Sequence, residues 1–406
     1  MDKKILIVTP KFPFPPTGAC EQDRFWGIKD FIRYGFEVRV ITKLFGEANE
    51  ELALKTGKEL DIKIFPVQYK FKNFSRKEKF KNFLSRLFPP FYLDGSAFEY
   101  KDKEIQGILK SQIEEWKPDL VWFDYTYLWP LYGIAKKRKI PIITRSINFE
   151  AIHFLLEDGI NFVNILRSIP KFFTEYTTLK NSNFLFSITP KEEKLYKKIG
   201  FKNKIKNLPL RGLPHCLKTE RTVRETDILH IFFMGSTYNV HHNRDAAKFI
   251  LQEIAPGLQR KSPGKFIFHI LGSKLPSELE KYVGENTIYE GPKYGQELEK
   301  FLSEMDVAVV PSLFGAGMQQ KVFEPLARGI PAVISERGLA GYPFKNKEHL
   351  LLAKSAEDFI ERIIELQDIN LRKKLSKNSM ELSSQIFSQR VIDNIVLNAV
   401  NNLCAR

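Results

Sequence analysis

Short apolar runs alternate with amphipathic stretches along the first half of the chain. The amphipathic stretches carry apolar residues at helical spacing and predict helices at Arg24–Arg33, Lys103–Trp116 and Glu192–Lys198. The apolar runs predict strands at Ile5–Thr9, Glu37–Thr42, Ile62–Val67, Leu120–Phe123, Ile140–Thr144 and Phe184–Ser187. Continuous apolar strands that alternate with helices indicate a mainly parallel sheet covered by helices on both faces.

The second half repeats this alternation after a proline-rich, basic stretch at Lys206–Arg224. The predicted strands are Leu229–Gly235, Phe266–Leu271, Thr287–Glu290, Asp306–Val310, Ile330–Ile334 and Leu350–Ala353, and the predicted helices are Arg244–Leu258, Pro276–Val283, Gln296–Glu304, Ala356–Gln367 and Leu371–Leu382. We therefore expect an α/β protein with two doubly wound, Rossmann-like domains, at residues 1–218 and 219–385, facing each other across a cleft. A last helix within residues 386–406 is expected to cross back to the first domain. Ligands of such sheets bind beyond the carboxyl ends of the strands.

Length and composition fit this division. A chain of 406 residues exceeds one ordinary core, and 43% hydrophobic with 27% charged residues is normal for a folded protein. No segment holds the roughly 18 to 20 uncharged apolar residues that a membrane span requires. The lysines and short apolar run at the N-terminus lack a cleavage site, so they predict a first strand and not a signal peptide. Cys20, Cys216 and Cys404 lie far apart, which indicates reduced thiols in a cytoplasmic protein.

The formal net charge of +15 is compatible with nucleic acid, anionic lipid or a phosphorylated small molecule as partner. The densest basic block is Tyr69–Phe88, in which Phe80, Phe83, Leu84, Leu87 and Phe88 fall at helical spacing among lysines and arginines. This pattern is typical of a helix that lies on a membrane surface, and equally of a cationic helix packed on its own domain. No aromatic RNA-binding signature or zinc knuckle accompanies the charge, so the sequence disfavours nucleic acid.

A strand, a glycine loop, a short helix and a second strand follow one another from residue 309 to residue 335. Gly315 and Gly317 let the backbone turn tightly and approach a ligand. The helix expected at 318–328 carries Lys321 in its first turn, with Glu324 on the same face. A helix N-terminus beside strand ends favours an anion such as a diphosphate, and a carboxylate one turn later can accept hydrogen bonds from a ribose diol. The same spacing also fits a plain turn followed by a solvated helix.

The run from Gly315 to Ala327, Gly-Ala-Gly-Met-Gln-Gln-Lys-Val-Phe-Glu-Pro-Leu-Ala, resembles the donor-binding signature of family 4 retaining glycosyltransferases of the GT-B fold. It is most similar to the branch that reads Gly-Ala-Gly-x-x-x-Lys-x-x-Glu. Phe233–Gly235, Ile270–Gly272 and Glu290–Pro292 fit the same family in order and spacing. The resemblance covers residues 229 to about 385, and the first half is similar in layout only.

The resemblance implies which residues bind and react. The donor-binding residues would be Gly235, Ser236, Asn239, Gly272, Gly291, Pro292, Gly315, Ala316, Gly317, Met318, Gln319, Gln320, Lys321 and Glu324. Glu324 would bind the ribose hydroxyls and Lys321 the diphosphate, with the nucleobase near Glu290–Lys293. The catalytic candidates are Lys321, Glu324, His153 and Glu150. The loops that would border the acceptor or the transferred sugar contain Thr17, Gly18, Ala19, Arg145 and Asn148.

The chain also departs from the family pattern. Ala316 stands where the wider family has a glutamate assigned to the donor sugar, and Ile147 stands where relatives often carry a histidine. Many members place Arg and Lys after the first strand of the donor domain, whereas this chain has Ser236, Asn239, His241 and His242. Neutralisation of the diphosphate is therefore expected to depend more on Lys321. For His153, one turn into a helix, a packing or capping role is the alternative.

The expected function is transfer of a sugar, with retention at the anomeric carbon, from a UDP- or GDP-linked sugar to an acceptor hydroxyl in polysaccharide or glycoconjugate assembly. The acceptor would be a saccharide or a lipid-linked saccharide. No Asp-x-Asp cluster stands at a strand end, so we expect a metal-independent enzyme with no cofactor besides the donor substrate. It would be cytoplasmic, and peripheral on the inner face of the membrane if Tyr69–Phe88 binds anionic lipid. The alternative is a non-catalytic nucleotide-sugar-binding protein on the same fold.

Overall fold

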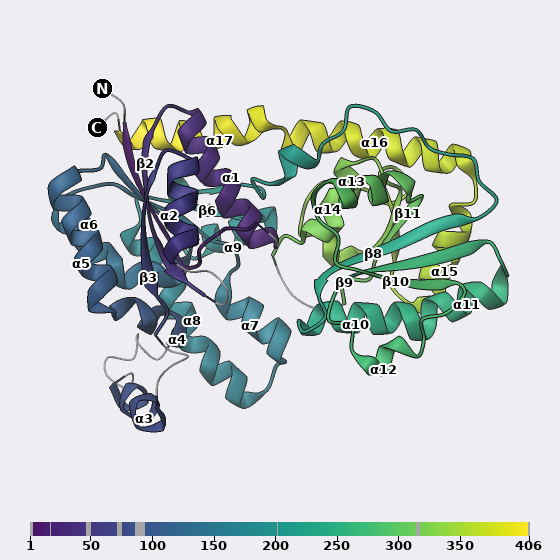
Figure 1. Cartoon of the computed structure of the whole chain (residues 1–406), viewed down its shortest axis with the longest axis horizontal. Helices are drawn as coiled ribbons and strands as arrows, with labels where there is room; N and C mark the ends of the chain where they lie inside the picture. Colours follow the sequence, from purple (N-terminus) through teal and green to yellow (C-terminus); the bar gives the residue numbers. More distant parts are fainter. Residues whose placement is uncertain are drawn as a thin grey trace. The chain divides into compact units, whose positions relative to one another are not determined.

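The structure is a computed structural model that describes residues 3–16, 18–45, 50–70, 75–85, 94–200, 202–313 and 317–404. It divides into two compact units, each built around one sheet (Figure 1). Unit 1 comprises Met1–Arg211 and Ile392–Arg406, and unit 2 comprises Gly212–Val391.

The described part of unit 1 holds a parallel seven-stranded sheet in the order β3-β2-β1-β4-β5-β6-β7. Its strands are β1 (Lys4–Thr9), β2 (Glu37–Leu44), β3 (Lys63–Gln68), β4 (Leu120–Phe123), β5 (Ile142–Arg145), β6 (Phe184–Ser187) and β7 (Ile205–Asn207). Ile5 pairs with Val38 on one side and with Leu120 on the other. Strand order reverses between β1 and β4, so the carboxyl edge at this point is the usual place for a ligand.

Most helices of unit 1 cover the sheet and bury its apolar side chains, whereas the described side chains of the helix at Arg76–Ser85 are exposed. They are α1 (Ala19–Arg33), α2 (Glu50–Glu59), α3 (Arg76–Ser85), α4 (Gly95–Phe98), α5 (Lys103–Ser111), α6 (Tyr132–Lys137), α7 (Glu150–Asp158), α8 (Phe162–Asn181) and α9 (Pro190–Lys198). Phe31 of α1 packs edge-on against the ring of Trp122 in β4, with ring centroids 5.2 Å apart. Burial of such large side chains provides most of the free energy that holds the helices on the sheet.

The last helix of the chain, α17 (Gln389–Cys404), packs on unit 1 although it follows unit 2 in sequence. Ile392, Val396 and Val400 are buried in the same apolar cluster as β1, β2 and α1. Arg33 forms an ion pair of 2.6 Å with Asp393, which fixes the helix beside α1. In Figure 1 this yellow helix lies against the purple first elements of the chain.

Unit 2 has a parallel sheet in the order β10-β9-β8-β11-β12-β13. Its strands are β8 (Leu229–Thr237), β9 (Phe266–Ser273), β10 (Thr287–Gly291), β11 (Val307–Val310), β12 (Ala332–Ser335) and β13 (Leu351–Ala353). Its helices are α10 (His241–Phe249), α11 (Ala255–Lys261), α12 (Ser277–Glu280), α13 (Gly295–Glu304), α14 (Gln320–Ala327), α15 (Ala356–Glu365) and α16 (Ile369–Phe387). Strand order reverses between β8 and β11. The predicted class, two doubly wound parallel sheets, is confirmed.

Several predicted helices differ from those observed. The single helix expected at Lys103–Trp116 becomes π-helical from Gln112, and the one expected at Arg244–Leu258 contains a π-helical turn at Ile250–Ile254, just before Pro256. Proline cannot donate the hydrogen bond of a continuing α-helix, which explains the second change. Helices α2 and α8 were not predicted. Across the described residues, none of the helices combines the length and apolar character needed to cross a bilayer.

Candidate functional site

Lys321 connects two helices at the carboxyl edge of the unit 2 sheet, where the strand order reverses. It lies in the first turn of α14, and its Nζ donates to Oδ1 of Asn243, 2.7 Å away on α10. Asn243 is buried and donates in turn to the backbone carbonyl of Thr237, at the end of β8, at 3.2 Å. One amine thus joins the start of α14, the start of α10 and the end of β8.

The amine of Lys321 has only neutral groups as partners in the described part of the chain. Its Nζ lies 5.3 Å from the centroid of the Phe233 ring, and its hydrogen-bond acceptor is an amide oxygen. Burial without a counter-charge lowers the pKa of Lys321 to about 8. An anion bound here would favour the protonated amine and raise that pKa, so the site is suited to a phosphate group.

Glu324 is fixed by neighbours of its own. Its carboxylate is 4% exposed, with Oε1 accepting from Arg328 at 2.8 Å and Oε2 accepting from Gln320 at 2.8 Å. Arg328 also pairs with Glu299 at 2.7 Å. Oε1 already accepts two hydrogen bonds from Arg328, so Oε2, which accepts one from Gln320, keeps acceptor capacity for a ligand. Lys321 and Glu324 therefore have separate partners, which the sequence pattern did not predict.

Two glycines allow the ends of β8 and β9 to approach each other. Gly272 has a φ of +140°, and a Cβ there would lie 2.3 Å from the carbonyl oxygen of Gly235. The hydroxyl of Tyr238 donates to the carbonyl of Leu271 at 2.6 Å, which ties the two loops together. Gly235 and Gly272 therefore have a structural reason to be glycine. Ser236 and Asn239, two of the expected donor-binding residues, are exposed beside them.

The loop before α14 is held at its far end. Gly315 and Ala316, both expected to bind the donor, lie outside the described residues. Gly317 has a φ of +79°, in the region that favours glycine. Met318 is buried and accepts a hydrogen bond at its sulfur from Tyr342 at 3.5 Å, while Oε1 of Gln319 accepts from Ser312 at 2.9 Å. The start of α14 is thus fixed by side chains from neighbouring loops.

A second polar cluster of unit 2 involves the residues expected near the nucleobase. Glu290 accepts from His269 at 2.8 Å and pairs with Lys293 at 3.2 Å, and His269 contacts His230 at 2.9 Å. Burial lowers the pKa of His269, against the opposing effect of Glu290. These groups line a cavity of about 420 Å³. Gly291, with a φ of +67°, is the last residue of β10, and Pro292 follows it.

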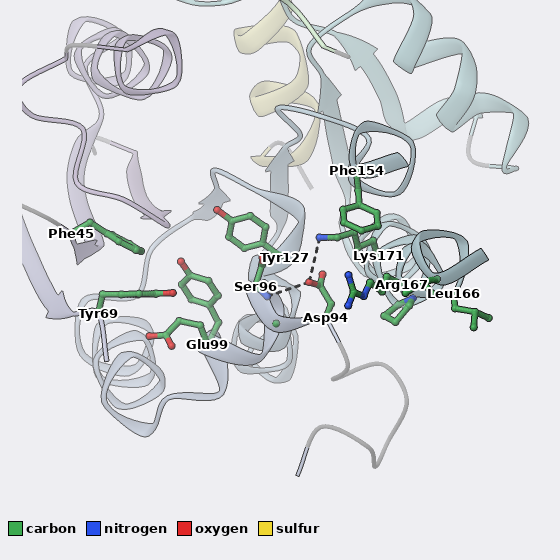
Figure 2. A pocket seen from close by; sticks show the side chains of 14 residues that line it. Phe45, Tyr69, Asp94, Ser96, Glu99, Tyr127, Phe154, Leu166, Arg167 and Lys171 are labelled. Atoms are coloured by element: carbon green, nitrogen blue, oxygen red, sulfur yellow. Dashed lines mark hydrogen bonds and ion pairs between the residues drawn. The ribbon is translucent and has the colours of Figure 1, made fainter. Parts of the chain in front are cut away.

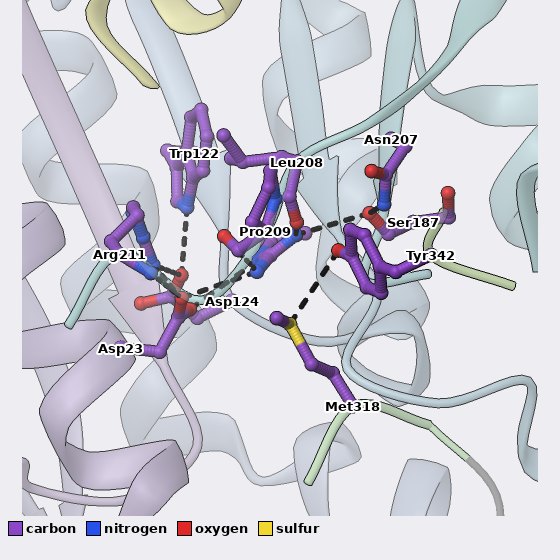
Figure 3. A network of polar contacts seen from close by, with 11 residues as sticks. Asp23, Trp122, Asp124, Ser187, Asn207, Leu208, Pro209, Arg211, Met318 and Tyr342 are labelled. Carbon is purple, nitrogen blue, oxygen red and sulfur yellow. Dashed lines mark hydrogen bonds and ion pairs between the residues drawn. The ribbon is translucent and has the colours of Figure 1, made fainter. Parts of the chain in front are cut away.

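Arg145, which the resemblance places in a loop that borders the acceptor or the transferred sugar, lies in the interior of unit 1. It is fully buried at the end of β5, where Nη2 pairs with Asp23 at 3.1 Å and Nη1 donates to the carbonyl of Leu208 at 2.5 Å. Arg211 binds the same Asp23 at 2.9 Å and reaches Asp124 at 3.3 Å (Figure 3). Burial acts to raise the pKa of Asp23, but the two arginines outweigh it and hold that pKa well below its usual range. Arg145 therefore holds the loops of unit 1 together and offers no exposed surface to a substrate.

The remaining candidates of unit 1 lie near the start of α7. Glu150 accepts a hydrogen bond from the hydroxyl of Tyr125, and that hydroxyl also accepts from Asn148 at 3.4 Å. His153, one turn later, lies 3.3 Å from Glu157 on the same helix. Gly18 is the N-cap of α1, Ala19 is its first residue, and Thr17 lies outside the described residues.

A cavity of about 860 Å³ opens at the carboxyl edge of the unit 1 sheet (Figure 2). Phe45 follows β2, Tyr69 follows β3 and Tyr127 follows β4, and all three line it. The rings of Phe45 and Tyr69 stack with centroids 4.0 Å apart. The sequence prediction missed this cavity because its aromatic residues come from separate loops. The available signal was an aromatic residue soon after each of three predicted strands.

Charged groups line the other side of this cavity. Lys171 of α8 lies 3.8 Å from Asp94 and 3.9 Å from Glu150, so it connects a catalytic candidate with the cavity wall. Arg167, also of α8, is exposed at the wall. Figure 2 shows Lys171 and Asp94 pointing toward each other, opposite Phe45 and Tyr69. Aromatic rings on one side and ionised groups on the other can hold a ligand that is partly apolar and partly polar.

In the ranges that the structure covers, no group of three or more His, Cys, Asp or Glu side chains is arranged to hold a metal ion.

Comparisons with known proteins agree with this architecture. Residues 229–368 match the family model described as glycosyl transferases group 1. No curated protein matches the chain. The chain is similar to the structure of HepE from Anabaena in complex with UDP, with a TM-score of 0.67 and 10% identity over 98% of this chain and 100% of that one.

Two further solved structures have the same architecture. The sucrose-phosphate synthase from Thermosynechococcus elongatus has a TM-score of 0.69 and 14% identity over 99% of both chains. A glycosyltransferase from Rickettsia africae has a TM-score of 0.65 and 12% identity over 99% of this chain and 98% of that one. The chain therefore has the two-domain GT-B fold, and its residues 229–368 are similar to a group 1 glycosyltransferase domain.

Proposed function

We propose that this protein is a retaining glycosyltransferase that moves a sugar from a nucleoside diphosphate sugar to an acceptor hydroxyl. The observation that carries the proposal is the amine of Lys321, without a counter-charge, beside the strand ends of unit 2. The family match covers this residue and Glu324. Structures of HepE in complex with UDP and with UDP-glucose favour a uridine nucleotide over a guanosine nucleotide as the donor.

In this proposal the diphosphate lies against Lys321 and the start of α14. Negative charge builds on the diphosphate as the bond to the sugar breaks. A protonated amine and a helix N-terminus then stabilise the transition state more than the ground state. Since the diphosphate itself favours protonation, the amine is charged when the donor is bound. Lys321 therefore assists departure of the leaving group and no metal ion is required.

Glu324 is proposed to accept hydrogen bonds from the ribose hydroxyls. Arg328 and Gln320 hold its carboxylate in one orientation, and Glu299 holds Arg328. A carboxylate fixed in advance loses little conformational entropy when the ligand binds.

The acceptor is proposed to bind in the aromatic cavity of unit 1. Sugar rings have apolar faces that pack on aromatic rings such as Phe45 and Tyr69, and hydroxyls that bond to carboxylates such as Asp94. Lys171 pairs with both Asp94 and Glu150, so it connects Glu150 to this cavity. A saccharide or lipid-linked saccharide fits these groups, as in assembly of a polysaccharide or glycoconjugate. The three free cysteines favour a location in the reducing cytoplasm. If the protein binds lipid, it would lie at the inner face of the membrane.

A panel of UDP- and GDP-linked sugars, with thermal shift and slow hydrolysis as readouts, tests this proposal. We expect one nucleotide sugar to raise the melting temperature and to be hydrolysed in the presence of EDTA. The second candidate function is a non-catalytic nucleotide-sugar-binding protein, which Ile147 in the place of the family's histidine favours. For such a binding protein, the nucleotide sugar should raise the melting temperature in the same way, but should be neither hydrolysed nor transferred.

A further inference from the structure

Helix α8 of unit 1 carries an exposed apolar face along most of its length. Asn161 caps its start by accepting from the backbone of Asn164 at 2.9 Å. The side chains left exposed are Phe162, Val163, Ile165, Leu166, Ile169, Phe172, Phe173 and Tyr176. Phe162 is the most exposed of them, at 75%. Apart from Val163 they form one stripe of the helix, since they recur every three or four residues over about 21 Å.

The opposite side of α8 holds the helix on unit 1. Thr174, Glu175, Thr178 and Leu179 are buried there. Glu175 accepts hydrogen bonds from the hydroxyls of Tyr196 and Thr126, at 2.6 and 3.1 Å. The apolar residues on the other side of α8 each stay at least 36% exposed, although the ring of Phe172 also contacts that of Phe149, with centroids 6.4 Å apart. An exposed apolar patch of this extent on a soluble fold usually marks an interaction surface.

The charge around this stripe is positive. Arg167, Lys171 and Lys180 are the basic residues of α8, and Glu175 is its one acidic residue. Burial raises the pKa of Glu175 to about 8, so at neutral pH it contributes little negative charge. Unit 1 has 39 Lys and Arg against 26 Asp and Glu, a net charge of +13, whereas unit 2 has 24 against 22, a net charge of +2. Nearly all of the excess charge belongs to the unit that carries the apolar stripe.

The positive charge of unit 1 favours an anionic lipid surface over a second copy of the chain as the partner of this stripe. A second copy of the chain would bring two strongly positive units together, which repel each other. An anionic lipid surface attracts a basic domain and accepts apolar side chains among its acyl chains. An apolar stripe with basic residues on the same helix is the composition of a helix that lies in a membrane interface.

We propose that α8 binds an anionic lipid surface, with its stripe from Phe162 to Tyr176 inserted at the boundary of headgroups and acyl chains. Val163 and Leu166 also line the aromatic cavity of unit 1, so the lipid-facing side of α8 continues into the wall of that cavity. Figure 2 shows Leu166 at the edge of the lining side chains. If the proposed function holds, the acceptor is a lipid-anchored molecule whose polar part reaches the cavity from the bilayer.

Sedimentation of the full chain with vesicles tests this proposal. The vesicles contain phosphatidylcholine with 30 mol% phosphatidylglycerol, and the test variant is Phe162→Ser/Ile169→Ser/Phe173→Ser. The matched control is Leu54→Ser/Ile228→Ser/Ile288→Ser, which removes three similarly exposed apolar side chains from other elements. We expect the α8 variant to bind at least tenfold more weakly than the parent, and the control to bind like the parent. Thermal melting checks that both variants are folded.

High salt distinguishes vesicle binding through the apolar stripe of α8 from vesicle binding through the basic helix α3. Insertion of apolar side chains persists at 0.5 M NaCl, whereas a purely electrostatic contact is screened. We expect the parent to remain largely bound at that salt, and Arg76→Gln/Lys77→Gln/Lys79→Gln to weaken binding less than the α8 variant does. Equal vesicle binding by the parent and the α8 variant would overturn the proposal. So would a dimer, seen by sedimentation velocity without lipid, that the α8 variant abolishes.

The proposed function is tested separately because the vesicle assay contains no nucleotide sugar. The α8 variant is expected to keep the parent's thermal shift with the nucleotide-sugar donor. Loss of vesicle binding with an intact donor shift assigns the stripe to lipid. If no nucleotide sugar raises the melting temperature of the parent, the proposed function is contradicted. The vesicle assay then still decides whether α8 binds lipid.

Discussion

The Nζ atom of Lys321 lies 2.7 Å from Oδ1 of Asn243, with no carboxylate paired to that amine among the described residues. The hydrogen bond crosses from α14 to α10 at the end of β8, where the sheet of unit 2 reverses its strand order. It places one titratable cation at the position where ligands of doubly wound sheets bind.

Replacing Lys321 with Met should lower turnover about 10² to 10³-fold, because a charge that stabilises the leaving diphosphate is lost. The dissociation constant for the donor should rise much less. Steady-state kinetics together with calorimetric titration of the nucleoside diphosphate separates the two effects. Lys248→Met, at an exposed position on α10, is the control and should behave like the parent. Equal losses in turnover and in donor affinity would show that Lys321 serves binding alone.

Replacing Asn243 with Asp puts a carboxylate next to Lys321. We expect the pKa of Lys321 to rise and the affinity for the nucleoside diphosphate to fall about tenfold or more, because the new negative charge occupies the amine and repels the ligand. Asn243→Ser keeps a polar neutral group and should have the smaller effect. Titration calorimetry checks both variants, and tighter binding by Asn243→Asp would contradict the assigned anion site.

Donor affinity should fall as the pH rises through the pKa of Lys321, which is about 8 in the free protein. The protonated amine favours binding of the anion, so the dissociation constant should increase from pH 7 to pH 9, by at most the factor that Lys321→Met causes at pH 7 and by no more than about tenfold. The diphosphate is fully ionised over this range and contributes no slope. Lys321→Met should remove the pH dependence. A parent and variant with the same pH profile would assign the titration to another group.

The same pKa affects folding with the opposite sign. In the free protein the pKa of Lys321 is lowered from 10.5 to about 8, so between these values the unfolded chain binds more protons than the folded one. The cost of burying this amine is therefore full below pH 8 and decreases as the pH rises toward 10.5. Chemical unfolding should show that Lys321→Met is more stabilising at pH 7 than at pH 10.

Arg145→Leu should destabilise unit 1 by about 3 to 5 kcal/mol, because it leaves Asp23 buried with one arginine fewer. Arg138→Leu, which removes an exposed ion pair with Glu114, should cost about 0 to 1 kcal/mol. Urea unfolding of both variants measures the difference. If the Arg145→Leu protein is as stable as the parent but has a raised KM for the acceptor, Arg145 binds the acceptor and its role is not structural.

Much of the fold could be predicted because its signals are local. The strands from β8 to β13 are short apolar runs, and Lys321 and Glu324 stand in one continuous segment. The ion-pair partners could not be predicted in this way. Asp23, Arg145 and Arg211 are far apart in sequence, and nothing local shows that Arg145 is fully buried.

Helix α8 was missed for a different reason. Apolar residues occupy both its exposed stripe and part of its packed side, and Pro170 interrupts the sequence, so the helical period is hidden. The cavity of unit 1 was missed because Phe45, Tyr69 and Tyr127 meet only when β1, β2, β3 and β4 form one sheet. Sites built from several loops leave little trace in any one segment.

The most direct test of the central claim is catalysed cleavage of the donor, with water in the place of the acceptor. The purified protein is incubated in EDTA with one nucleotide sugar at a time, and release of nucleoside diphosphate is followed for the parent and for Lys321→Met. We predict release from at least one UDP- or GDP-linked sugar by the parent, with the α- or β-configuration of the donor kept in the product, and release at least 10²-fold slower by the variant. Equal rates for parent and variant, or binding of nucleotide sugars with no release from any of them, would contradict the assignment of a glycosyltransferase that acts through Lys321.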